Sequence, residues 1–495
     1  MLRQLLRVVA VIGGVLALTG SLSAAVALAA PTLPECASAG PLLRYVALFD
    51  PETPQRQATR SIRAACGTSV AYYPQIGVAV VTSAEPGFAT LFGADHAYSA
   101  QAEALPTPQL TNPKANDTPV LRTADRLPAA AQALATDRSA EQWGMELIHA
   151  PQARTINPGS ADVVVGVLDS GIDATHPDLA TVIDPARSAG CLSGKPDQAP
   201  AAWNPSAMVH GTHVAGTIAA ADDGRGVTGV APGVRLASVK VVDDDGFVYP
   251  EYVVCGFMWA AQQQMRITNS SFYLDPWLLT CSNVPGQAVA HEAVRRAVQY
   301  ATAHGVLSVA AAGNERMDLA DPRLDLRSPN NAPDPRPRAV DKHCDVLPAE
   351  LPGVIAVSAV GAQRVISAYS SYGLGVITVT APGGDLAQRP AAFPDGCVLS
   401  TVPGGYGYSC GTSMAAPHAA GVAALLASSL PSARPEELAA LMRQQADPLA
   451  CPAHADLDAV CAGNTVNGFY GHGLVNALTA VTAQRNSGAT GRADR

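Results

Sequence analysis

From about residue 143 onward, short apolar runs alternate with longer stretches of helical periodicity. The strand-like runs are 163–168, 236–242, 267–271, 306–311, 354–360 and 376–380. The helical stretches are 210–221, 252–264, 290–304, 414–428 and 435–445. Runs that are apolar throughout are typical of strands buried on both faces, and the helices supply the crossovers that parallel strands need. The pattern therefore predicts an α/β fold, a doubly wound and mostly parallel sheet with helices on both faces.

The first residues are typical of a targeting segment. Arg3 and Arg7 precede an apolar run, 8–18, and a stretch of small residues ends at Ala27-Leu-Ala-Ala30. This arrangement predicts a secretory signal peptide over residues 1–29, with an uncleaved anchor as the alternative because residues 8–30 carry no charge. No later segment reaches the roughly 18 apolar residues that span a bilayer. We therefore expect a secreted, extracellular protein without a stable membrane anchor.

Three further parts of the chain differ from the alternating region. Residues 30–100 contain β-like runs at 43–49 and 76–82 with a helix-compatible stretch between them, which predicts a small α+β domain. Residues 101–141 are polar and interrupted by prolines, which predicts an exposed linker open to proteolysis. Residues 483–495 form a polar tail. We also expect surface insertions where periodicity is low, at 183–209, 315–350 and 384–408.

The cysteines and the charge narrow the functional classes. Ten cysteines are present, two before residue 100 and eight after residue 190, and none forms a C-x-x-C pair. In an exported chain this predicts disulfides rather than a zinc site, with connectivity left open except for a favoured local pair, Cys451–Cys461. The net charge is −9 and no long basic run occurs, so we expect no nucleic-acid partner.

Four residues of catalytic type stand where strands end or helices begin. Asp169 follows the first strand, His210 opens a helix, Asn314 follows the strand at 306–311, and Ser413 opens the helix at 414–428. Each alone has a structural explanation as a turn or cap residue. Carboxyl ends of parallel strands meet at one edge of a sheet, so we expect the four to converge. Together they supply a nucleophile, a base, a residue that orients the base, and a donor for an oxyanion.

The segments around these residues resemble the signatures of subtilisin-like serine proteases, the subtilases. They are Asp169-Ser-Gly-Ile-Asp, His210-Gly-Thr-His-Val-Ala-Gly-Thr, Ala311-Ala-Gly-Asn314 and Gly411-Thr-Ser413-Met-Ala-Ala-Pro-His, in the order of that family. The resemblance covers about residues 143–480. It implies a secreted serine endopeptidase that acts through an acyl-enzyme, with Asp169 as orienting acid, His210 as general base, Ser413 as nucleophile and Asn314 as oxyanion donor. No cofactor is implied for the chemistry.

The resemblance also implies a domain plan and partners. Residues 30–100 resemble, less specifically, the inhibitory propeptide of the family, with an unrelated small β/α module as the alternative. The chain is therefore expected to be a preproenzyme. The linker 101–141 would hold the maturation cleavage, and the peptidase domain would cover 142–482. The expected partners are a polypeptide substrate and the chain's own propeptide, and the expected state is a monomer.

The same resemblance suggests a substrate cleft between two strands. One wall is Ser270, Ser271 and Phe272, the other is Gly246, Phe247 and Val248, and the floor is Ala311, Ala312 and Gly313. The family pattern has small residues where this chain has Phe272 and Tyr273. We expect these rings either to narrow a pocket or to pack outward under the insertion that follows Glu315.

The sequence leaves open a calcium site and two other functions. The resemblance suggests a structural calcium with Asp178 and Asp223 as candidate ligands, against a solvated acidic turn. A metal-dependent hydrolase would use His210, His213 and Asp169, but it lacks a third ligand pattern and leaves Ser413 unexplained. An inactive peptide-binding relative would normally lack a triad residue, and none is missing.

Overall fold

The computed structural model describes residues 36, 40–104, 122–123, 136–206, 208–332, 335–452, 460–461 and 466–482. The predicted signal peptide, most of the predicted linker and the polar tail lie outside these residues. Within the described ranges, no helix combines the length and the apolar character that crossing a membrane requires.

The centre of the molecule is a seven-stranded parallel sheet in the order β16-β15-β11-β9-β6-β8-β7. Its strands are β6 (Val164–Asp169), β7 (Ala189–Gly190), β8 (Arg235–Lys240), β9 (Ile267–Ser270), β11 (Leu307–Ala311), β15 (Ile355–Val360) and β16 (Val379–Pro382). The chain proceeds from β6 to one side through β8 and then returns to β9 on the other side. The carboxyl ends of β6 and β9 thus lie at a topological switch point, where α/β sheets bind their ligands.

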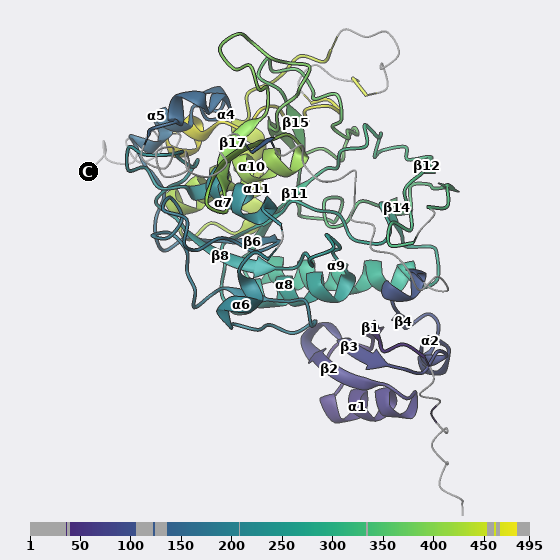
Figure 1. The fold of residues 1–495 in the computed structure, drawn as a ribbon. Coiled ribbons are helices and arrows are strands. Elements are labelled where there is room, and N and C mark those ends of the chain that lie inside the picture. Colours follow the sequence, from purple (N-terminus) through teal and green to yellow (C-terminus); the bar gives the residue numbers. More distant parts are fainter. Residues whose placement is uncertain are drawn as a thin grey trace, which may run out of the picture. The chain divides into compact units, whose positions relative to one another are not determined.

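Helices cover both faces of this sheet, as the apolar runs predict (Figure 1). One face carries α7 (His210–Ala219), α10 (Thr412–Ser429) and α11 (Pro435–Gln445), and the other carries α8 (Pro250–Gln262) and α9 (Gln287–Ala303). Alternate side chains of β6 face opposite ways, so Val165 and Val167 join the first core while Val164 and Leu168 join the second. The predicted doubly wound fold is confirmed.

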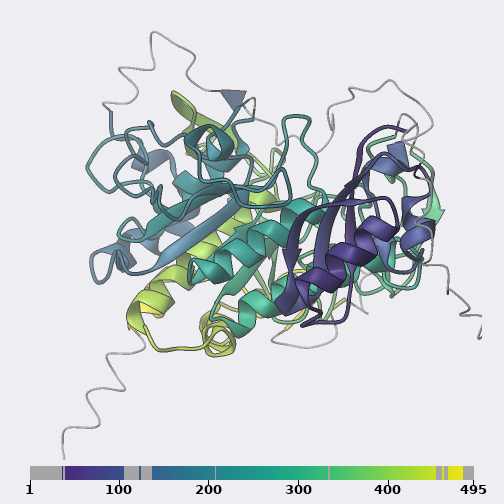
Figure 2. The same ribbon diagram turned by 90° about the horizontal axis from the view of Figure 1, so that it is seen from below.

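Residues 40–104 form a small α+β unit with a core of its own. Its antiparallel sheet has the order β2-β3-β1-β4. Its elements are β1 (Leu43–Leu48), α1 (Gln55–Ala64), β2 (Thr68–Tyr73), η1 (Pro74–Ile76), β3 (Val78–Ser83), α2 (Phe88–Phe92), β4 (Ala97–Tyr98) and η2 (Gln101–Ala104). Helix α1 lies across one face of the strands, shown in purple in Figure 2, and Ile62 packs there against Val81 and Phe88. We call residues 40–104 the N-terminal domain.

Two of the three predicted surface insertions are wrong in part. Residues 384–408 contain β17 (Val398–Val402) and most of β18 (Gly405–Ser409), a hairpin that is buried along its length and pairs with β5 (Arg122–Thr123). Residues 183–209 contain α6 (Pro200–Trp203) and β7, which extends the main sheet. The glycine-rich hairpin has little apolar periodicity of its own. Its burial comes from packing against α7, which local sequence does not reveal.

The remaining elements are short. They are η3 (Ser139–Glu141), α4 (Trp143–Leu147), α5 (Ala150–Arg154), β10 (Thr280–Cys281), β12 (Leu324–Asp325), β13 (Arg338–Ala339) and β14 (Cys344–Asp345). All ten cysteines form disulfides, namely Cys36–Cys66, Cys191–Cys255, Cys281–Cys344, Cys397–Cys410 and Cys451–Cys461. The one local pair favoured from the sequence is among them.

Candidate active site

The four predicted catalytic residues are carried by elements that end or begin at the carboxyl edge of the sheet. Asp169 is the last residue of β6, and His210 is the first residue of α7. Asn314 follows β11, and Ser413 lies in the first turn of α10. Parallel strands therefore set the positions of the acid and the amide, and two helix starts set those of the imidazole and the hydroxyl.

Asp169 and His210 form a buried pair. The Nδ1 of His210 lies 2.7 Å from Oδ1 of Asp169, and the Asp169 side chain is 1% exposed. The backbone N–H of Ser170 donates to the same oxygen at 2.7 Å. Helix α7 reaches this strand closely because residue 211 is glycine, since a Cβ there would collide with the carbonyl of Gly171. A carboxylate in this position keeps the imidazole in the tautomer with a free Nε2.

Ser413 is tied to the end of β9. Its hydroxyl donates to the carbonyl of Ser271 at 3.1 Å, and the Ser271 hydroxyl donates to the carbonyl of Ser413 at 2.9 Å. Among the hydrogen bonds of the described residues, none joins Ser413 to His210. This reciprocal pair fixes the start of α10 against the predicted substrate strand.

The side-chain amide of Asn314 has a defined orientation. Its Oδ1 accepts from both the backbone N–H and the hydroxyl of Thr412, each at 2.9 Å. An amide oxygen held by two donors leaves the Nδ2 hydrogens directed away from them. The Thr412 hydroxyl in turn accepts from the N–H of Gly313 at 3.2 Å. Two adjacent loops therefore present an N–H donor next to the start of α10.

Two further histidines near the site are buried and neutral. His213 Nε2 lies 3.1 Å from the carbonyls of Val398 and Gly407, so this nitrogen donates and is not directed at Asp169. Burial lowers the pKa of His213 to about 3 and that of His418 to about 4. The metal-dependent hydrolase that would use His213 together with His210 therefore gains no support from this geometry.

On one predicted wall of the substrate cleft, most backbone groups are already hydrogen-bonded within the chain. The N–H and carbonyl of Phe247 are bonded to Asp243 at 2.8 and 3.0 Å, and both backbone groups of Val248 are bonded to Asp275. Gly246 borders open space, because the nearest heavy atom to a Cβ there would be Met208 Sδ at 3.9 Å. Backbone pairing of a peptide with Phe247 or Val248 would have to displace these bonds, so it stays a prediction for this side.

The other predicted cleft residues lie at the ends of β9 and β11. Ser270 and Ser271 are buried, as are Ala311 and Ala312, while Gly313 is half-buried with φ +103°. Of the two unexpected aromatic residues, Tyr273 is buried and its hydroxyl accepts from Nδ2 of Asn330 at 3.0 Å. Tyr273 thus packs under the insertion, whereas Phe272 keeps part of its ring exposed.

Asp178 and Asp223, the candidate calcium ligands, have internal partners. The Tyr406 hydroxyl donates to the Asp178 carboxylate at 3.0 Å, and the Val227 N–H donates to it at 3.0 Å. Asp223 lies 3.6 Å from the guanidinium of Arg225. In the described part of the chain, no three His, Cys, Asp or Glu side chains are grouped as metal ligands would be. Both carboxylates thus have partners within the chain, and the calcium site stays a prediction.

Two roles were missed from the sequence. Thr412, which orients Asn314, lies inside the Gly-Thr-Ser segment identified from the sequence. Its hydrogen bond to Asn314, 98 residues away, could not be predicted. Asp275 holds the backbone of Val248 across 27 residues. Neither contact follows from a local pattern, because each depends on how distant segments meet.

Comparison with known proteins agrees with this geometry. The model of the Subtilase family matches residues 160–473. Fervidolysin from Fervidobacterium pennivorans is 32% identical over 326 residues, which cover 62% of this chain and 40% of that protein. Subtilisin NAT from Bacillus subtilis subsp. natto is 31% identical over 341 residues, 68% of this chain and 70% of that protein.

Solved structures show the same fold. The epidermin leader peptide processing serine protease of Staphylococcus aureus superposes with a TM-score of 0.66 at 19% identity, covering 90% of this chain and 98% of that one. A protease from Pseudoalteromonas arctica superposes with a TM-score of 0.53 at 28% identity, covering 71% of this chain and 99% of that one. With the family model matched over most of the peptidase region and the catalytic residue types at the expected edge, the chain belongs to the subtilase family of serine proteases.

Proposed function

We propose that this protein is a secreted serine endopeptidase, made as a preproenzyme, that cleaves peptide bonds through an acyl-enzyme on Ser413. The observation that carries the proposal is the 2.7 Å pair between His210 and buried Asp169 at the same sheet edge as Ser413 and Asn314. A hydroxyl needs a base beside it to become a nucleophile, and an imidazole held by a carboxylate is such a base.

In the proposed reaction, the Ser413 hydroxyl leaves the carbonyl of Ser271 and turns toward His210 Nε2, which takes its proton. The Ser413 oxygen attacks the peptide carbonyl, and His210 then gives the proton to the departing amine. Water repeats the sequence on the acyl-enzyme and regenerates the hydroxyl. Asp169 stays ionised throughout and stabilises the imidazolium.

The proposed oxyanion site is formed by the Asn314 Nδ2 hydrogens and the Ser413 N–H. The N–H groups in the first turn of a helix lack partners within the helix, so the start of α10 offers donors and the positive end of its dipole. Thr412 supports this role for Asn314, because it occupies the amide oxygen and leaves the N–H side for the substrate. The chemistry needs no metal.

Maturation is the second part of the proposal. We infer that the N-terminal domain is an inhibitory propeptide, and that cleavage in residues 101–141 ends its covalent link to a monomeric mature enzyme. The ten bridged cysteines support export to an oxidising compartment. Some relatives by fold are described as leader-peptide processing proteases, so maturation of one secreted precursor is the substrate class we would test first.

The direct test is hydrolysis of a denatured protein by the mature enzyme. The parent should produce peptides with and without a chelator, and Ser413→Ala and His210→Ala should each remove hydrolysis. Ser413→Ala should also leave an uncut precursor if the chain processes itself. Parent-like turnover in Ser413→Ala would contradict the proposal, whereas chelator-sensitive turnover would favour the metal-dependent alternative.

A further inference from the structure

The end of the N-terminal domain contacts a part of the peptidase domain that is separate from the catalytic residues. Residues 98–104 run past Trp277 and past the insertion that follows Glu315. We propose that Trp277, Asn331 and Arg338 form a clamp that binds residues 98–103 and keeps the N-terminal domain attached after the linker is cut. This inference rests on the proposed propeptide role of that domain, and it assigns the recognition to specific side chains.

The first contact joins two aromatic side chains. The indole N–H of Trp277 donates to the Tyr98 hydroxyl at 2.7 Å. Tyr98 is 7% exposed, and burial raises the pKa of its phenol well above the usual value. The ring of Tyr98 also lies against Gly286, where a Cβ would be 3.0 Å from Cδ2 of the ring. A tyrosine is therefore recognised here by both its ring and its hydroxyl.

The second contact is a hydrogen bond to the backbone of Ala100, two residues after Tyr98. Nδ2 of Asn331 donates to the carbonyl of Ala100 at 2.8 Å, and the same nitrogen lies 3.4 Å from the Tyr249 hydroxyl. Asn331 is 8% exposed, so this bond is shielded from water. A shielded bond to a backbone carbonyl holds the chain direction, because a buried donor left without a partner is costly.

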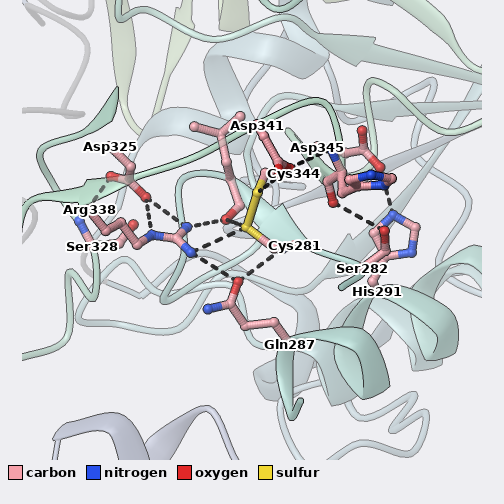
Figure 3. Close-up of a disulfide and its surroundings, with 12 residues drawn as sticks. Cys281, Ser282, Gln287, His291, Asp325, Ser328, Arg338, Asp341, Cys344 and Asp345 are labelled. Carbon is pink, nitrogen blue, oxygen red and sulfur yellow. Dashed lines mark hydrogen bonds and ion pairs between the residues drawn. A yellow bond between two sulfur atoms is a disulfide. The ribbon is translucent and has the colours of Figure 1, made fainter. Parts of the chain in front are cut away.

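The third member, Arg338, lies over the Trp277 ring and adds charge. Its guanidinium lies 4.6 Å from the centre of the Trp277 ring. Nε and one terminal nitrogen donate to the fully buried Asp325 at 3.1 and 2.9 Å, and the other donates to Gln287 at 3.1 Å, beside the Cys281–Cys344 disulfide. Figure 3 shows the guanidinium between Asp325 on one side and Gln287 with the disulfide on the other. Arg338 is thus a positioning residue for the clamp.

The charge of the bound segment matches the clamp. Burial raises the pKa of Glu103, and the cations Arg336 and Arg338 oppose this shift. The bound segment therefore offers a tyrosine, a backbone carbonyl and an acid at positions 98, 100 and 103. Tyr98 contacts Trp277 and the Ala100 carbonyl contacts Asn331, whereas Glu103 hydrogen-bonds to the Tyr98 hydroxyl within the segment and lies in the field of Arg336 and Arg338. The side chains of Tyr98 and Glu103 thus give the site a sequence preference.

The test measures retention of the N-terminal domain in the full exported chain carrying Ser413→Ala. A cleavage site for an unrelated protease is placed in the linker between residues 105 and 121, before β5, so that β5 stays with the peptidase region. The chain is cut, and release of the fragment is followed by size exclusion over time. The parent fragment should stay bound. Trp277→Phe keeps a ring for Arg338 but removes the donor, and it should speed release about fivefold or more.

Tyr98→Phe should accelerate release at least as much, because it removes the hydroxyl that bonds to both Trp277 and Glu103. The double variant should release no faster than Tyr98→Phe, because the Trp277 bond is already lost in that single variant. Tyr72→Phe is the matched control, since the Tyr72 hydroxyl donates to the Thr53 carbonyl within the N-terminal domain. Asn331→Asp, which replaces a donor by an acceptor opposite the Ala100 carbonyl, is an independent variant and should also speed release.

Equal release from the parent, Trp277→Phe and Asn331→Asp would overturn the clamp, and so would dissociation of the parent fragment immediately after cutting. If the double variant speeds release by the product of the two single effects, Tyr98 and Trp277 act independently. That result would also overturn the clamp. Retention is measured without hydrolysis by the chain itself. A negative result therefore leaves the Ser413 chemistry intact, and failure of that chemistry leaves the retention result intact.

Discussion

The side-chain amide of Asn314 is held just after the end of β11 by two hydrogen bonds from Thr412. The Ala-Ala-Gly-Asn segment at the end of a predicted strand indicates an amide at the catalytic edge, and the structure places it there. Which end of the amide faces the substrate depends on Thr412, which comes from another element. Motifs therefore indicate the groups that are proposed to react, while the contacts that orient these groups become visible only when distant segments are brought together.

Asn314→Ala should lower kcat by about 10²–10³, the loss measured when such a donor was removed from a subtilisin, with little change in KM. The reason is that the oxyanion exists only near the transition state, so the ground state gains nothing from this donor. Thr412→Val keeps the backbone donor to Asn314 and removes only the hydroxyl, so it should lower kcat by a smaller factor. Steady-state kinetics on one peptide distinguishes these outcomes, and a pure KM effect in Asn314→Ala would contradict the role.

The carboxyl of Asp243 is expected to make the stability of the folded protein depend on pH. Burial raises the pKa of its carboxyl from 3.8 to about 6, the Phe247 N–H opposes this, and Asp275 and Asp245 add to it. A raised pKa means that ionisation costs more in the folded state, so the stability present below about pH 4 is lost as the pH rises to about 6.

We therefore expect Asp243→Asn, which keeps the acceptor for Phe247, to raise the melting temperature above pH 6 and to leave it unchanged near pH 4. Asp245→Asn, at an exposed position, is the control. Both are measured in the Ser413→Ala background to avoid self-digestion. Equal melting temperatures for Asp243→Asn and its parent at pH 8 would show that this carboxyl carries no such penalty.

At the scale of elements, the strands and long helices of the peptidase domain are predictable, because each one has enough apolar residues to show its period. The β17–β18 hairpin is not, since Gly405-Tyr-Gly-Tyr408 alternates small and aromatic residues and its burial comes from α7. The same hairpin brings Tyr406 to Asp178, a contact over 228 residues. Asp178, which the family resemblance associates with calcium, is thus hydrogen-bonded to the hydroxyl of Tyr406.

Tyr406→Phe should therefore lower the melting temperature by a few degrees, because it leaves a buried carboxylate short of a donor. A chelator should leave the melting temperature of the parent unchanged. Tyr408→Phe is the matched control on the same strand, since the Tyr408 hydroxyl bonds to half-exposed Glu141. A large drop in the parent's melting temperature with chelator, reversed by calcium, would restore calcium to this loop.

Phe272, which lies just after the end of β9, is the residue that we expect to affect substrate specificity. Its ring is partly exposed beside Ser271, whereas Tyr273 is buried and bonded to Asn330. Phe272→Gly should broaden the residues accepted at the cleaved bond, seen as relative kcat/KM values across a peptide library. Tyr273→Phe should leave the profile unchanged. An unchanged profile in a folded Phe272→Gly enzyme would make this ring structural as well.

At the scale of the whole molecule, the even division of cysteines before residue 100 and after residue 190 matches the structure. Cys36–Cys66 lies in the N-terminal region, and the other four disulfides lie in the peptidase region. Sequence could not give the pairing of the long loops, because Cys191 and Cys255 are 64 residues apart and meet only in the folded sheet. The disulfides link segments within each region, so cleavage between the two regions leaves them joined by non-covalent contacts alone.

Covalent labelling shows whether Ser413 is the nucleophile of a serine endopeptidase, as we propose. The mature enzyme is treated with a fluorophosphonate, and the modified residue is identified by mass spectrometry. We expect one label per chain, on Ser413, with labelling unchanged by a chelator and lost in His210→Ala. An enzyme that hydrolyses peptides at full rate while Ser413 stays unlabelled would contradict the proposal.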